Sequence, residues 1–131
     1  VSAQPGLRRP AIIADLAEMR AVESAVSKGD WSLNVLDRSA RLVEKRPAFL
    51  KARFIYGSLL LANKRAAEAA VELERVVAAE GQRAAARVNL GNAYLTLGRT
   101  ADAEAQFRAA LAAEPGNSAA RERLTAMGRT P

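Results

Sequence analysis

Apolar residues recur along this chain at the spacing of an α-helix, in runs that come in pairs. Between residues 84 and 117, the first run ends at Gly98 and the second ends before Pro115. The apolar positions of the two runs are Leu90, Tyr94 and Leu97, then Ala103, Phe107, Ala110 and Leu111. Because glycine and proline interrupt helices at those two places, this segment is predicted to be two helices joined by a tight turn.

The same pattern returns every 34 residues, which predicts a stack of similar helix pairs. The helix-breaking and small residues that keep this spacing are Pro47, Gly81 and Pro115, Gly57 and Gly91, and Ala69 and Ala103. The aligned apolar pairs are Tyr56 with Leu90, Leu60 with Tyr94, Leu73 with Phe107, and Val76 with Ala110. We expect Gly91 and Ala103 to lie where the paired helices touch, because a large side chain there would force the axes apart.

The turn inside the last complete pair carries further signals. Gly98 can adopt the positive φ that often ends a helix. Thr100 is placed to cap the second helix, and Asp102 and Glu104 fall in its first turn, near the positive end of the helix dipole. The second helix is therefore expected to start at about Thr100.

The run Asn89-Leu90-Gly91-Asn92-Ala93-Tyr94, followed by Gly98, Ala103, Phe107, Ala110 and Pro115, resembles a tetratricopeptide repeat. The resemblance is closest over residues 84–117. It is looser over 50–83, where Lys64 replaces the turn glycine and Gly81 the proline, and loosest over 16–49, where Glu23 replaces the helix-contact glycine. It implies an all-α, right-handed superhelical solenoid of about three helix-turn-helix units.

Arg53 and Arg87 depart from the family pattern, which commonly has a large apolar residue at these positions. Their aliphatic stems can pack while the guanidinium groups reach water.

The two ends of the chain are interpreted as an arm and a cap. Residues 1–10 are expected to be a flexible N-terminal arm, with Pro10 at the first helical position, and 11–127 the repeat domain. Residues 118–127 are predicted to form a helix that caps the stack, with Ser118 as the N-cap residue of that helix, and 128–131 a tail.

Composition argues against an enzyme. The 131 residues include no cysteine and no histidine, which excludes thiolate chemistry and removes the commonest general base. Neighbouring carboxylates such as Asp102 and Glu104 are spaced i,i+2, which points them roughly 200° apart around a helix. We therefore expect no catalytic residues, no cofactor and no metal.

Charge and hydropathy narrow the class of partner. The net charge of +6 is spread over the chain, whereas nucleic-acid-binding proteins usually concentrate cations on one face, so nucleic acid is disfavoured. The longest mainly apolar run, 54–62, is too short to span a membrane, so we expect a soluble protein of the cytoplasm or periplasm. Arginine outnumbers lysine 16 to 4, which favours a GC-rich and hence bacterial genome.

A solenoid of helix pairs has a concave groove lined by the first helix of each unit. From the helix register, the candidate partner-binding residues are Arg20, Ser24, Lys51, Phe54, Ser58, Leu61, Val88, Asn89 and Asn92. The resemblance implies that Asn89 and Asn92 hydrogen-bond the backbone of an extended peptide, although both also belong to the family's common sequence and could serve the fold. Phe54 could accept an apolar side chain or helix face, or instead pack against Arg20 or Leu61.

Some members of the family bind the C-terminal tails of chaperones through a clamp for carboxylates, and this sequence does not match the residue pattern of that clamp. Phe54, Ser58 and Ala85 stand where that clamp would need lysine and asparagine. The sequence therefore favours a non-catalytic adaptor that binds a peptide or helix of another protein. The alternatives are a self-associating structural module or a regulatory fragment of a larger envelope-assembly protein or enzyme.

Overall fold

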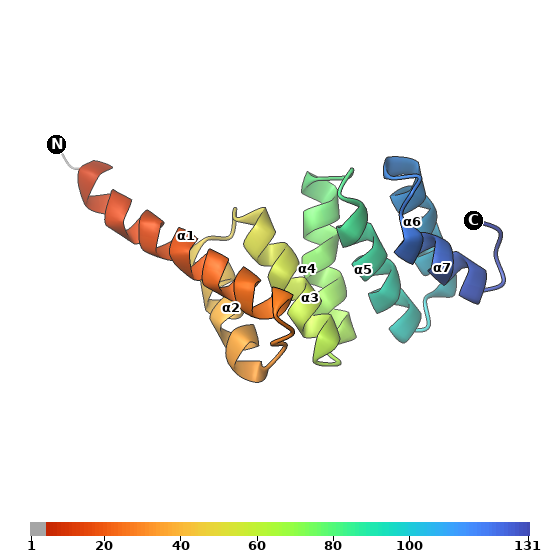
Figure 1. Ribbon diagram of the computed structural model, residues 1–131, viewed down its shortest axis with the longest axis horizontal. Coiled ribbons are helices and arrows are strands. Elements are labelled where there is room, and N and C mark those ends of the chain that lie inside the picture. The colour runs from red at the N-terminus through yellow and green to blue at the C-terminus, as the bar shows by residue number, and fades with distance from the viewer. Residues whose placement is uncertain (1–4) are drawn as a thin grey trace.

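The computed structural model describes the backbone of residues 5–131 and the side chains from residue 11 onward. Within that range the chain forms helices and no strands (Figure 1). In order they are α1 (Pro5–Ser27), α2 (Leu33–Lys45), α3 (Leu50–Ala62), α4 (Ala66–Ala79), α5 (Ala84–Thr96), α6 (Thr100–Ala113) and α7 (Ser118–Ala126). The predicted all-α class is confirmed.

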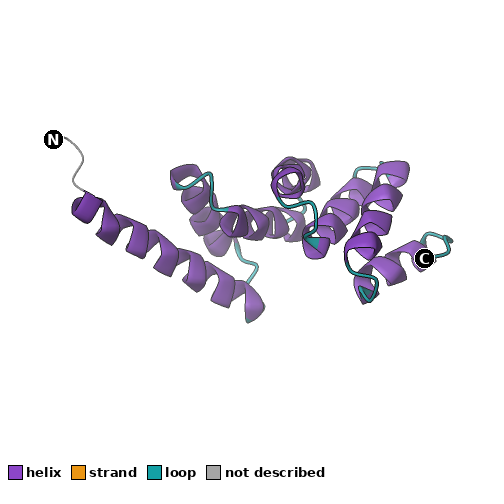
Figure 2. Ribbon diagram, turned by 90° about the horizontal axis from the view of Figure 1, so that it is seen from above, coloured by secondary structure: helices purple, strands orange, loops and turns teal. Residues whose placement is uncertain are grey.

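The helices stack in chain order as three pairs, α1–α2, α3–α4 and α5–α6, followed by α7. Each helix packs on the next one along the chain, and the first helices of neighbouring pairs also touch, α1 with α3 and α3 with α5. Figure 2 shows the same row of helices from above, extended from one end of the chain to the other. This is the solenoid arrangement that the 34-residue period predicts.

Glycine allows the two later pairs to close tightly. A Cβ atom added to Gly91 would lie 2.6 Å from Cε1 of Phe107, and one added to Gly57 would lie 2.9 Å from Cγ of Leu73. Phe107, Leu73 and Ala103 are fully buried. The predicted helix contact at Gly91 and Ala103 is confirmed.

Arginines spaced 34 residues apart form hydrogen bonds between helices and the loops that precede them. Nη2 of Arg53, Nε of Arg87 and Nη2 of Arg121 each donate to the carbonyl oxygen six residues earlier, at 2.7, 2.7 and 2.9 Å. Arg53 also reaches Glu72 at 2.6 Å, and Arg87 reaches Gln106 at 3.0 Å. The expectation that the guanidinium group reaches water was wrong for Arg53, which is buried with its guanidinium bound by the loop carbonyl and by Glu72, whereas Arg87 is half-buried.

Two predicted helix caps are also corrected. The residue before α6 is Arg99, whose side chain makes no capping bond, and Thr100 is already helical. Asn117 rather than Ser118 caps α7, since its Oδ1 accepts from the N–H of Ala120 at 2.9 Å. Gly98 has φ +77°, as predicted for the end of the first helix.

The N-terminal helix is longer than predicted. It begins at Pro5 rather than Pro10, so only residues 1–4 of the proposed arm lie outside the described residues. Pro10 removes just the hydrogen bond to the carbonyl of residue 6, in the first turns, which a helix tolerates better than a break in its middle. Figure 1 shows the first half of α1 reaching beyond α2, and Ile13 on this half is 64% exposed.

Candidate partner-binding groove

The first helices of neighbouring pairs touch, α1 with α3 and α3 with α5, and α5 and α7 line a common hollow; we call the surface of these four helices the first-helix face. Two hollows open between its helices. The first, the α1–α3 pocket, has a volume of about 220 Å³ and is lined by Glu23, Val26, Ser27, Lys51, Phe54, Ile55 and Arg83. The second, the α5–α7 hollow, has a volume of about 510 Å³ and is lined by Val88, Asn89, Asn92, Ala119, Glu122, Arg123 and Ala126.

Five of the nine predicted groove residues line these hollows. Lys51 and Phe54 belong to the α1–α3 pocket, and Val88, Asn89 and Asn92 to the α5–α7 hollow. The structure does not gather the nine into a single site, because α3 and α5 pack against each other between the two hollows.

The other four predicted residues lie outside both hollows. Ser58 joins α3 to α5, since its Oγ accepts from Nδ2 of Asn89 at 2.9 Å. Leu61 packs against the main hydrophobic core. Arg20 is exposed and Ser24 half-buried on α1.

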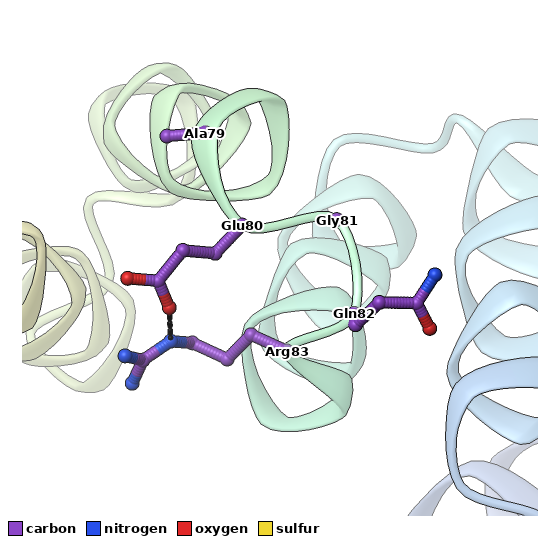
Figure 3. Close-up of a pocket in the computed structure, with 5 residues that line it drawn as sticks. All are labelled: Ala79, Glu80, Gly81, Gln82 and Arg83. Atoms are coloured by element: carbon purple, nitrogen blue, oxygen red, sulfur yellow. Dashed lines mark hydrogen bonds and ion pairs between the residues drawn. The ribbon is translucent and has the colours of Figure 1, made fainter.

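Arg83 is a groove residue that the sequence analysis missed. Its Cζ lies 5.4 Å from the centroid of the Phe54 ring, so Phe54 contacts this cation as well as the main hydrophobic core. Figure 3 shows how the turn between α4 and α5 carries Arg83, whose Nε donates to Glu80 at 2.8 Å. The 34-residue period offers no hint of this role, because the equivalent positions hold Phe49 and Asn117.

The turn in Figure 3 borders a further hollow of about 620 Å³. Its lining residues are the consecutive 79–83, so it is the surface of one turn rather than a space formed between helices. It holds none of the predicted groove residues, and we do not include it in the candidate site.

Tyr94 holds α5 in place behind the groove. Its hydroxyl donates to Oε2 of Glu74 on α4 at 2.6 Å, and Arg99 lies over its ring at 4.2 Å. Burial, together with this bond to the carboxylate, raises the pKa of Tyr94 to about 12. The hydroxyl therefore keeps its proton, and with it the hydrogen bond that joins α4 to α5, throughout the physiological range.

The described side chains limit the chemistry that this surface offers. Among the side chains that the structure describes, no three histidine, cysteine or carboxylate groups come together as a metal site would need. No described helix is both long enough and apolar enough to cross a membrane. The two hollows offer two amides, a small apolar pocket, three cations and two carboxylates; the charged residues are Lys51, Arg83, Arg123, Glu23 and Glu122.

A family model described as "Tetratricopeptide repeat" matches residues 60–127, just over half of the chain. The chain belongs to the tetratricopeptide repeat family. The match covers the end of α3 and all of α4 to α7, and so includes the unit 84–117 where the sequence resemblance is closest.

Solved tetratricopeptide repeat domains have the same fold. The first such domain of Spaghetti (RPAP3), bound to the HSP90 peptide SRMEEVD, is 18% identical with a TM-score of 0.79, over 87% of this chain and 90% of that one. The second domain of human RPAP3, in complex with the HSP70 peptide SGPTIEEVD, is 19% identical with a TM-score of 0.78, over 90% and 98%. YrrB, a repeat protein with an unusual peptide-binding site, is 21% identical with a TM-score of 0.76, over 85% and 57%. No curated protein matches the sequence of this chain.

Proposed function

We propose that this protein is a non-catalytic adaptor whose first-helix face binds an extended segment of another protein. Membership of the tetratricopeptide repeat family supports this, since stacked helix pairs present long preformed surfaces. Three similar domains also support it, because two were solved with short peptides and the third has a peptide-binding site.

The observation that carries the proposal is the amide of Asn92. Its Oδ1 is buried and has no hydrogen-bond partner among the residues that the structure describes, while the residue lines the α5–α7 hollow. A buried polar atom left unpaired costs about 1–3 kcal/mol. A peptide N–H donated to Oδ1 would remove that cost once the Asn92 side chain rotates so that this atom faces the hollow.

Asn89 and Ser58 hold the neighbouring part of this surface in a fixed shape. The amide nitrogen of Asn89 donates to Ser58, which in turn donates to the carbonyl of Phe54 at 2.9 Å. This chain of bonds leaves the amide oxygen of Asn89 for an incoming N–H. A surface already ordered before binding lowers the entropy lost on association to that of the ligand segment.

A direct test is to select a library of random dodecapeptides displayed on phage against the immobilised chain, then to titrate the most enriched peptide by calorimetry. We expect a peptide consensus to emerge, and Asn92→Ala to weaken its binding about tenfold through loss of one desolvated hydrogen bond. Asn34→Ala is the matched control, because Asn34 is exposed on α2. Failure to enrich any sequence, or equal affinity of the Asn92 variant and the native chain, would refute the proposal.

Self-association is a second candidate, favoured by one observation. Ile12 and Ile13 on the projecting half of α1 are 39% and 64% exposed, and apolar side chains in that state often mark an interface. Light scattering over a range of concentrations tests it. A mass that stays monomeric up to high concentration would remove this candidate.

A further inference from the structure

We propose that the α1–α3 pocket receives one aliphatic side chain of the bound segment, that an adjacent acidic residue of the segment pairs with Lys51 and Arg83, and that Glu23 restrains this binding. The inference rests on the proposed peptide-binding function and assigns a chemistry to one end of the groove.

The interior of the pocket is apolar and small. Val26, Phe54 and Ile55 supply hydrocarbon surface, and the volume of about 220 Å³ lies below the roughly 300–1,000 Å³ of sites that enclose a whole small ligand. Val26 and Phe54 also pack on the main hydrophobic core, so the pocket walls are supported from behind. These dimensions suit a single side chain of a longer segment.

Two cations and one carboxylate line the same pocket. Lys51 and Arg83 together carry two positive charges and Glu23 one negative charge, so the lining has an excess of one positive charge. Glu80, outside the pocket, already pairs with Nε of Arg83, so a ligand carboxylate would bind the terminal nitrogens of Arg83 and the remaining donors of Lys51 rather than neutralise a free charge. A basic ligand segment would instead add to the repulsion.

The cations can accept a new partner without losing their present ones. Nζ of Lys51 lies 2.7 Å from Oε2 of Glu23, which leaves two of its three donors. Arg83 uses Nε for Glu80, and its terminal nitrogens make no hydrogen bond to any side chain or backbone group that the structure describes. A guanidinium held over an aromatic ring therefore presents its forked edge to a carboxylate.

Glu23 sets the strength of the subsite. It lies beside the place that the ligand carboxylate would take, and it already neutralises Lys51. Its charge must then oppose acidic ligands, and its removal should favour them. If Glu23 served only to hold Lys51 in place, removing its charge would not be expected to tighten peptide binding.

The two hollows differ in a way that orients the ligand. Glu122 in the α5–α7 hollow occupies the position two periods after Phe54, and the apolar residues of that hollow are the smaller Val88, Ala119 and Ala126. The aromatic wall therefore exists only at the α1–α3 end. A bound segment would place its aliphatic side chain at that end and its backbone amides along Asn92 at the other.

The test uses the same phage library, selected in parallel against the native chain and Phe54→Ala. We expect native selections to enrich an aliphatic residue next to aspartate or glutamate, and this pair to disappear with Phe54→Ala. For the top synthetic peptide, measured by fluorescence anisotropy, replacing its aliphatic residue with alanine should weaken binding about tenfold. Peptide substitutions leave the protein untouched, so they remain informative if Phe54→Ala fails to fold.

Glu23→Gln should bind the same peptide about threefold more tightly at low salt, and the gain should shrink as salt rises. Glu44→Gln removes an equal charge from an exposed site on α2 and should leave affinity unchanged. Enriched peptides without the acidic and aliphatic pair, or unchanged or weaker binding by Glu23→Gln, would overturn the inference. If such peptides still depend on Asn92, the proposed function survives; if no peptide is enriched, both fall.

Discussion

The first helix pair and the two later pairs are held together by different interactions. In α3–α4 and α5–α6, a glycine lets the helices meet and a partly or fully buried arginine joins the loop to the second helix. In α1–α2 the equivalent positions hold Glu23 and Met19. That pair is joined instead by Asp15 with Arg46 and Lys45, at 2.6 and 3.2 Å, and by Glu18 with Arg38 at 2.7 Å.

The difference shows that one repeat geometry can be reached by packing or by charge. Close packing is insensitive to pH, whereas carboxylates must stay ionised to hold their partners. The α5–α6 pair, whose arginine binds the neutral Gln106, should therefore fail when side-chain shape is changed. The α3–α4 pair should also fail when its buried ion pair is broken, and the first pair when the medium is acidified.

The largest effect is expected from Arg53→Leu. It would leave Glu72, whose side chain is 13% exposed, with only Arg75 at 3.5 Å. Leaving a largely buried carboxylate without its close partner should lower the free energy of unfolding by about 3 kcal/mol, as measured by urea denaturation. Arg75→Leu is the matched control, because Arg75 is 60% exposed, and should cost less than about 1 kcal/mol. Similar losses for the two variants would show that burial of Arg53 does not matter.

A smaller loss is expected from Gly91→Leu. Even a Cβ atom would lie within 3 Å of three atoms of the Phe107 ring, so the helices must separate. Overpacking of this kind should lower the free energy of unfolding by about 2 kcal/mol. Gly116→Leu is the control, since its Cβ would meet nothing within 4 Å. An unchanged unfolding midpoint for Gly91→Leu would contradict the contact between α5 and α6.

Acidification should act locally on the first pair. The hydrogen bond from Arg46, aided by Lys45, lowers the pKa of Asp15 below its ordinary value. A lowered folded-state pKa stabilises the fold above the ordinary pKa, and this contribution is lost as pH falls through the lowered value. We expect the protection of the α1 amides against hydrogen exchange, taken relative to the unfolded-chain rate at each pH, to fall below about pH 4, before the protection of the α5 amides does. Asp15→Asn should abolish the difference, and equal protection of the two helices in the native chain at every pH would contradict it.

Most of the architecture could be predicted because it rests on local periodicity. Spacing and residue size are visible in the sequence, so the pairs and the contact at Gly91 could be found. The roles of Arg53 and Arg87 depend on which carbonyl and which second-helix side chain fold back onto them, which composition does not reveal. Their recurrence with Arg121 every 34 residues was nevertheless a signal that could have been read.

The groove was predicted less completely than the fold. Helix register placed Phe54 and Asn92 on the correct helices. It could not place Arg83, because this residue lies in the loop between α4 and α5 and reaches the Phe54 ring on α3. The sequence analysis also assigned the N-cap of α7 to Ser118 instead of Asn117. Both residue types can cap a helix, and the backbone conformation, which the sequence does not reveal, decides which of two neighbours does so.

The hydrogen bonds from arginine to the loop carbonyls determine which loops can accept inserted residues. Four residues make up each loop that follows a pair, namely 46–49, 80–83 and 114–117, and one such arginine bond spans each of these loops. The turns inside the pairs vary in length: five residues at 28–32, and three at 63–65 and at 97–99. Insertions should consequently accumulate on the edge where the turns within pairs lie. On the opposite edge, a single added residue would move the carbonyl out of reach of its arginine, so an epitope tag or a fused domain belongs in the turns.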